Sequence, residues 1–167
     1  GYALLGAGWL VLKTEGELRE RAYQLAPLLA TAMLLAIGIV SLWTPFIEGR
    51  YLARWLSWPS VAYVAPVPIL TALAAWRLVV AIRERRDREP FIATLALFLL
   101  CYVGLGISLY PNVVPPGISI WDAAAPDKSL AFLLVGAAIL IPLILAYTGY
   151  AYWVFRGKID PDGGYHH

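Results

Sequence analysis

The chain has 167 residues, of which 60% are hydrophobic and only 14% are charged, whereas soluble domains usually carry about a quarter charged residues. This composition is typical of an integral membrane protein. The net charge is only +2, and the basic residues gather in short loops that form no phosphate-tracking face, so a nucleic acid partner is not expected.

The first apolar run, Gly1 to Leu12, is too short to cross a membrane. As a helix its twelve residues reach about 18 Å, against a hydrocarbon core of about 30 Å. The sequence also begins without an initiator Met and without the features of a signal peptide. We therefore expect residues 1–12 to be the end of a truncated transmembrane helix, and the chain to be the back part of a longer protein.

Four longer runs follow in chain order, each free of Asp, Glu and Lys and each long enough to span a membrane. They are Gln24–Pro45, Ser60–Ile82, Phe91–Tyr110 and Ser129–Phe155. The predicted fold class is all-α: a polytopic integral membrane helical bundle with four complete transmembrane helices plus the end of a truncated one. Residues 13–155 would form the bundle, and residues 156–167 a cytoplasmic tail.

Basic residues in the connecting segments predict which way the bundle faces, because cytoplasmic loops carry the excess of Lys and Arg. One side has nine, Lys13, Arg19, Arg21, Arg83, Arg85, Arg86, Arg88, Arg156 and Lys158, and the other has three, Arg50, Arg54 and Lys128. The C-terminus is therefore expected in the cytoplasm. The loop before the last span would lie outside, which is the periplasm in a bacterium.

That outer loop contains the stretch "SIWDAAAPDKS", residues 119–129. Trp121 suits the headgroup level, where an indole keeps its ring apolar and its N–H wet. Asp122 and Asp127 lie just upstream of a predicted helix, where a carboxylate can accept backbone N–H groups. We expect an anchor and a cap here. A proton-carrying role for Asp122 is the alternative.

Arg77 is the only charged residue inside a predicted span. Its Cα lies about 9 Å along the helix from the basic loop at Arg83, a distance that a snorkelling arginine largely covers. The alternative is a buried functional ion pair. The charged run Arg83–Glu89 either recruits anionic lipid or simply marks the inner side.

Other residues that could carry chemistry are scarce. Interruptions are expected at Pro66, Pro68 and Pro142, either as kinks or as transporter-like ion sites. Haem in a bilayer needs an axial ligand such as His or Met, yet both histidines, His166 and His167, end the chain and Met33 is its only methionine. We predict no haem on this chain, no metal site and no catalytic residue.

The residues also resemble a known family. The runs "GWLVLKTEGELRERA" (8–22), "YPNVVPPGISIWDAAAP" (110–126) and "LVGAAILIPLILAYTGYAYWVFRGK" (134–158) are similar to the C-terminal half of subunit II of the cytochrome bd-type quinol oxidases, including the cyanide-insensitive branch. Lys13, Thr14, Glu15 and Gly16 belong to the first of these motifs, and Trp121 and Asp122 to the second.

The resemblance implies a non-haem accessory subunit of a membrane-bound respiratory complex, in the bacterial inner membrane, that oxidises quinol and reduces dioxygen to water. Haems b and d would belong to the partner, the haem-bearing subunit I. Membrane lipid and quinone are further candidate partners. The family's proposed proton-route residues lie in the other half of subunit II, so none is transferred here. A secondary transporter and a membrane scaffold or assembly protein remain the alternatives.

Overall fold

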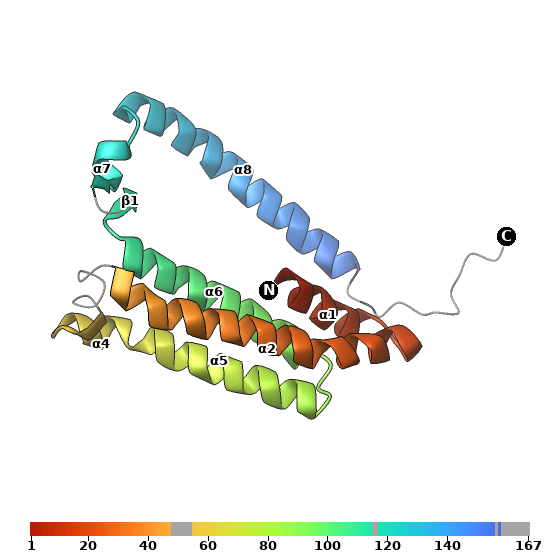
Figure 1. Ribbon diagram of the computed structural model, residues 1–167. Helices are drawn as coiled ribbons and strands as arrows, with labels where there is room; N and C mark the ends of the chain where they lie inside the picture. The colour runs from red at the N-terminus through yellow and green to blue at the C-terminus, as the bar shows by residue number, and fades with distance from the viewer. Residues whose placement is uncertain (48–54, 115–116, 156, 158–167) are drawn as a thin grey trace. The chain divides into compact units, whose positions relative to one another are not determined.

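The structure is a computed structural model that describes residues 1–47, 55–114, 117–155 and 157, and these residues are almost wholly helical (Figure 1). Contacts divide them into two compact units, Gly1–Ser108 and Leu109–Gly157. The predicted tail, 156–167, lies outside the described residues except for Gly157, as do Arg50 and Arg54. That residues 13–155 form one bundle stays a prediction.

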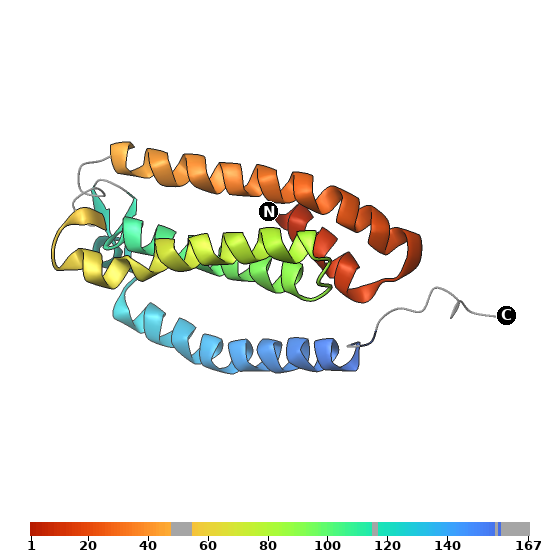
Figure 2. The same ribbon diagram turned by 90° about the horizontal axis from the view of Figure 1, so that it is seen from below.

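The first unit consists of helices that follow one another along the chain. They are α1 (Tyr2–Lys13), α2 (Gly16–Ile47), α4 (Ser60–Val64), α5 (Pro66–Arg83) and α6 (Glu89–Leu109), which ends at the boundary with the second unit. Figures 1 and 2 both show α2, α5 and α6 running alongside one another, with the shorter α1 against the start of α2. One end of this unit therefore collects the α1–α2 and α5–α6 connections.

The prediction of four membrane-spanning helices is confirmed by length and composition. Candidate spans cover Gly16–Thr44, Ser60–Arg83, Glu89–Leu109 and Asp127–Val154. The charged stretch Lys13–Arg21, between the first two apolar runs, predicts a connecting loop. This prediction is wrong, because only Thr14 and Glu15 lie between α1 and α2. Loss of apolar character marks the edge of the membrane, but Glu, Leu and Arg are good helix formers and continue the helix beyond it.

A seam of buried side chains from four helices holds the first unit together. It comprises Leu4 of α1, Ala26, Ala30 and Met33 of α2, Leu78 and Ile82 of α5, and Ala93 and Leu97 of α6. The alanines let backbones approach closely, which is how helices gain contact in lipid, where burial from water gives no driving force. Packing around Leu78 and Leu97 therefore holds the four helices together.

Gly8 permits the closest approach between α1 and α6. A Cβ at this position would lie 3.1 Å from the Phe91 Cα and 3.2 Å from its backbone nitrogen. Trp9 packs its ring 5.3 Å from the Phe91 ring, centre to centre. The absence of a side chain at Gly8 thus lets the end of α1 rest on the first turn of α6.

Hydroxyl groups within the helices bond to their own backbone. The donors are Thr31, Thr44, Thr71, Thr94 and Ser108, each of which reaches the carbonyl oxygen four residues earlier at 2.7 to 2.9 Å. Thr94 is fully buried. Such bonds satisfy a polar group where the surroundings are apolar.

The proline positions behave differently from one another. At Pro66 one helix gives way to the next, because α4 ends at Val64 and α5 begins at Pro66. A proline at the first position of a helix loses no backbone hydrogen bond, since the N–H there has no partner within the helix. Helix α5 continues through Pro68 and α8 through Pro142, so neither proline breaks its helix, and a kink at these residues stays a prediction. A single lost backbone hydrogen bond is tolerated inside a long apolar helix.

The second unit departs from the all-α prediction by a small hairpin. Strands β1 (Asn112–Val114) and β2 (Ile118–Ser119) pair antiparallel, with Asn112 opposite Ser119. The short helix α7 (Ile120–Ala123) follows directly, and then the long helix α8 (Asp127–Val154). Every residue of α8 is at least partly exposed. This helix therefore has no buried face in the described structure.

Candidate functional site

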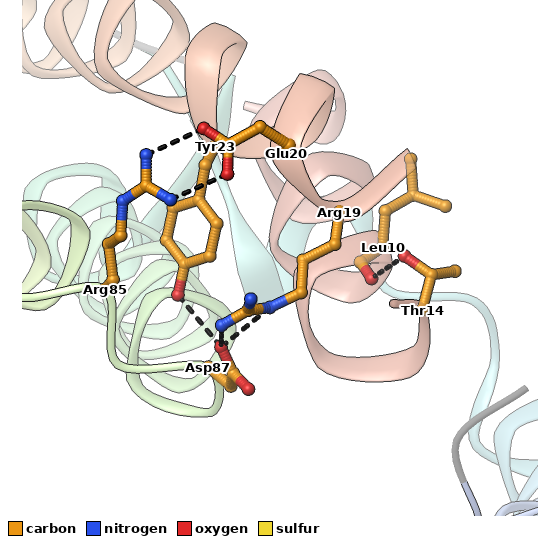
Figure 3. A network of polar contacts seen from close by, with 7 residues as sticks. All are labelled: Leu10, Thr14, Arg19, Glu20, Tyr23, Arg85 and Asp87. Carbon is orange, nitrogen blue, oxygen red and sulfur yellow. Dashed lines mark hydrogen bonds and ion pairs between the residues drawn. The ribbon is translucent and has the colours of Figure 1, made fainter. Parts of the chain in front are cut away.

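The densest polar cluster joins the first turns of α2 to the turn between α5 and α6 (Figure 3). The Arg19 guanidinium donates to Asp87 Oδ1 from Nη2 at 2.5 Å and from Nε at 3.1 Å. The Tyr23 hydroxyl donates to the same oxygen at 3.1 Å. Both members of the ion pair are about two-thirds buried, so the carboxylate exchanges much of its water for three donors.

A second ion pair, beside the first, connects the same two elements. Arg85 donates to both carboxylate oxygens of Glu20, at 2.6 and 2.7 Å, in the parallel geometry that favours arginine over lysine. The hydrogen bonds to Glu20 raise the pKa of Arg85 above its ordinary value. The ring of Tyr23 lies between the two guanidinium groups, 5.3 Å from Arg19 and 5.4 Å from Arg85. Tyr23 thus contributes a cation–π contact to each pair.

The backbone conformation of the α5–α6 turn directs the side chains of Arg85 and Asp87 toward α2. Arg85 adopts φ of +53°, Arg86 N–H donates to Ala81 C=O at 2.9 Å, and Arg85 N–H donates to Ile82 C=O at 3.3 Å. This is the Schellman pattern, in which the left-handed position is usually Gly. An arginine there costs backbone energy, and its half-exposed pair with Glu20 offsets part of that cost. The turn thereby points Arg85 and Asp87 at α2.

Four charged groups form a chain along the other side of that turn. Arg86 pairs with Glu84 at 2.6 Å and with Glu89 at 2.7 Å, and Arg77 pairs with Glu89 at 3.1 Å. Bonds to Glu89 and Glu84 raise the pKa of Arg86. Arg77, Glu84 and Arg86 are about half exposed, whereas Glu89 is about two-thirds buried. Glu89 lies in the first turn of α6, where a negative charge is favoured by the helix dipole. The structure thus places Arg77 in a half-exposed contact with a helix start.

The sequence motif of Lys13, Thr14, Glu15 and Gly16 forms the sharp connection between α1 and α2. Thr14 ends α1, and its hydroxyl donates to Leu10 C=O at 2.6 Å (Figure 3). Gly16 begins α2 with φ of +65°, a conformation that glycine adopts without cost. Lys13 is buried, with Nζ 5.2 Å from the centre of the Trp9 ring. These residues shape a turn, and Glu15 is exposed on it.

Trp121 and Asp122 lie in α7 of the second unit. Ser119 and Asp122 form a capping box: the Asp122 N–H donates to Ser119 Oγ, and Asp122 Oδ2 accepts from the Ser119 N–H, both at 3.2 Å. The Ser119 hydroxyl, and then its N–H, lower the pKa of Asp122. Trp121 is exposed and meets Tyr110 edge-on at 6.3 Å. Asp127 begins α8, whose N-cap is Pro126.

The network of Arg19, Glu20, Tyr23 and Asp87 was not predicted from the sequence. Its partners are 64 to 68 residues apart, so neither segment indicates the other locally. One feature of the sequence could have indicated the network. Residues 13–21 and 83–89, both predicted to lie on the basic side, each contain acidic as well as basic residues that can pair with one another. Within the described residues no three His, Cys, Asp or Glu side chains gather as metal ligands, and the network consists of paired charges.

The chain is similar to known proteins that all belong to one family. The family described as cytochrome bd terminal oxidase subunit II matches residues 1–155. Cytochrome bd-I ubiquinol oxidase subunit 2 of Escherichia coli K12 is 26% identical over 195 aligned residues, covering 94% of this chain and 49% of the relative. Probable cytochrome oxidase subunit 2 of Haemophilus influenzae is 24% identical, covering 94% and 49%.

Cytochrome bd ubiquinol oxidase subunit 2 of Bacillus subtilis is 22% identical, covering 93% of this chain and 46% of the relative. The chain thus spans about half the length of the curated relatives it matches. The family match, by contrast, extends over nearly the whole chain, including both units. The chain therefore belongs to the cytochrome bd terminal oxidase subunit II family.

Proposed function

We propose that the chain is part of a non-haem accessory subunit in a membrane-bound respiratory quinol:oxygen oxidoreductase, which reduces dioxygen to water. The observation that carries this proposal is the family match over residues 1–155. Relatives in Escherichia coli and Bacillus subtilis are named subunit 2 of a ubiquinol oxidase. A second subunit, subunit I, would bear haems b and d and oxidise the quinol, and this chain would support it.

The described residues offer few of the His and Met side chains that hold haem iron. Haem iron in proteins is held by side chains such as His, Met, Cys or Tyr. The described part of the chain contains no histidine, and the Met33 side chain packs in the helix seam among alanines and leucines. Cys101 and the exposed Tyr102 lie next to each other on α6. This scarcity of His and Met ligands supports the proposal that the haems lie on the partner subunit.

The apolar outer surface supports a subunit that is covered by lipid and by other protein. Only 11% to 22% of the most apolar stretch is buried in the three spans of the first unit, and none of it in α8. Burial this low would be unfavourable in water, since exposed apolar patches of this size mark interaction surfaces. No specific observation favours a transporter, because α8 continues through Pro142.

The first prediction tests the proposed complex. The chain, purified from native membranes in mild detergent through an affinity tag, should bring with it a larger subunit and the absorption bands of haems b and d. Matched purification of an unrelated tagged membrane protein from the same membranes is the control. A colourless preparation at full yield, with no larger partner, would support a scaffold and contradict the proposal.

The second prediction tests the proposed orientation, with the α5–α6 turn in the cytoplasm and the hairpin outside. In a background lacking Cys101, the only cysteine, Arg88→Cys places one thiol in the α5–α6 turn and Ala125→Cys places one between α7 and α8. A membrane-impermeant maleimide added to intact cells should label only Ala125→Cys, because of the nine-to-three distribution of basic residues. Labelling of only Arg88→Cys would reverse the topology.

The third prediction tests the ion pairs between α2 and the turn, whose proposed role is to fix the inner end of the first unit. Asp87→Ala removes the acceptor of three hydrogen bonds and leaves Arg19 partly buried without its partner. We expect a loss of about 1 to 2 kcal/mol of stability, between the values for exposed pairs and for bonds to charged groups. Thermal melting of the purified complex measures it.

Glu17→Ala is the matched control for Asp87→Ala, since it also removes one carboxylate from the same end. Glu17 is exposed and lies 3.7 Å from Arg21, so the change should stay within about 0.5 kcal/mol. Equal melting temperatures for the two variants would show that the pairs between α2 and the turn contribute nothing specific.

The fourth prediction concerns Asp122, for which we propose a capping role. Asp122→Ala should lower the melting temperature of the complex more than Asp122→Asn, because an amide oxygen still accepts the Ser119 N–H. The folded pKa is depressed, so the contribution is present at neutral pH and is lost as pH falls through the folded pKa. Equal loss of quinol-driven oxygen uptake in both variants, with unchanged melting, would instead indicate proton transfer.

A further inference from the structure

An open groove of about 450 Å³ runs between α5 and α6 of the first unit. Leu70 and Leu73 line it on α5, and Ile92 and Ala96 line it on α6. Arg77 and Glu89 form one end. Leu73 and Ile92 are more than half exposed, so the groove opens outward. Because both helices are candidate spans, an outward-facing apolar groove here meets the hydrocarbon of a bilayer.

The charged end of the groove holds an arginine at an unusual depth. Arg77 lies about 9 Å along α5 from the helix end at Arg83. A guanidinium carries five N–H donors, and within the described residues the one polar contact of Arg77 is the 3.1 Å bond to Glu89. Donors that remain at the edge of the hydrocarbon need an acceptor. The groove therefore combines an apolar channel with unused donors.

The charges around this end are unbalanced. Arg85 and Asp87 pair with residues of α2, so Arg77 and the rest of the adjoining turn, residues 83–89, contribute four arginines against Glu84 and Glu89. Arg83 and Arg88 are exposed, and neither forms an ion pair with another described residue. This group of six residues thus carries a net charge of +2, and that surplus attracts an anionic headgroup. A neutral quinone headgroup would leave this surplus unused.

We propose that the α5–α6 groove binds one acyl chain of an anionic phospholipid whose phosphate accepts hydrogen bonds from Arg77. The phosphate oxygens match the planar fork of an arginine, and Arg83 and Arg88 add attraction from the surface. This inference goes beyond the proposed oxidase function. It requires only that α5 and α6 cross a membrane, and so the two proposals fail independently.

Lipid retention by the purified protein tests the proposal. The tagged protein, with the partners it keeps in mild detergent, is incubated with equal amounts of phosphatidylglycerol and phosphatidylcholine, washed, and analysed for bound lipid by mass spectrometry. Wild type should retain phosphatidylglycerol selectively. Arg77→Gln should retain about tenfold less, as expected for loss of charged hydrogen bonds. Arg21→Gln, an exposed arginine on α2, removes the same charge away from the groove and should retain wild-type amounts.

A second pair of variants tests the acyl-chain channel without changing charge. Ala96→Phe should fill the groove and lower phosphatidylglycerol retention, whereas Ala72→Phe, at an exposed position of α5 outside the groove, should not. In wild type, phosphatidylglycerol with a photoactivatable acyl chain should label peptides from residues 70–77 and 92–100. If Arg77→Gln does not assemble, this photolabelling of the wild type still tests whether an acyl chain lies in the groove.

Three results would overturn the proposal. One is equal retention of both lipids by wild type, which would indicate ordinary annular lipid. Another is undiminished phosphatidylglycerol on Arg77→Gln or Ala96→Phe. The third is the extraction of a quinone in place of phospholipid at stoichiometric amount.

Discussion

Hydrocarbon offers a polar group no partner outside the protein, and this constraint governs where the polar side chains of the chain lie. Hydroxyls within the spans bond to their own helix, as Thr94 does to Pro90 C=O. Carboxylates and guanidiniums gather at helix ends, where water reaches them. Because the middles of the spans of the first unit are apolar, packing of small and branched residues holds these helices together there, and the ion pairs act at their ends.

Two kinds of contact hold the first unit together, one in the middle of its spans and one at the helix ends. The seam around Leu78 and Leu97 brings four helices together, but such contacts are not directional and tolerate sliding. The pairs Arg19–Asp87 and Glu20–Arg85 join residues 65 or more positions apart and specify one register. Two pairs that share the ring of Tyr23 specify it more tightly than one.

The number and places of the spans could be predicted from the sequence, because a long apolar run free of Asp, Glu and Lys is typical of a membrane-spanning helix. The start of α2 was misplaced, since a charged helical turn resembles a loop when only hydropathy is read. The hairpin at Asn112 and Ser119 was missed because two very short strands carry no periodic signal. The ion-pair network required the tertiary arrangement, which brings two separate charged segments together. Family membership rests on residue similarity, which helix physics alone does not supply.

All members of the helix seam lie between Leu4 and Leu97, and this has a consequence for synthesis. Proteins are made from the N-terminus, and completed parts fold while later parts are still being translated. The last contact that closes the seam becomes possible when Leu97 has left the ribosome, before any residue of α8 (Asp127–Val154) has joined it in the membrane. The contacts of the seam can therefore form without any contribution from α8.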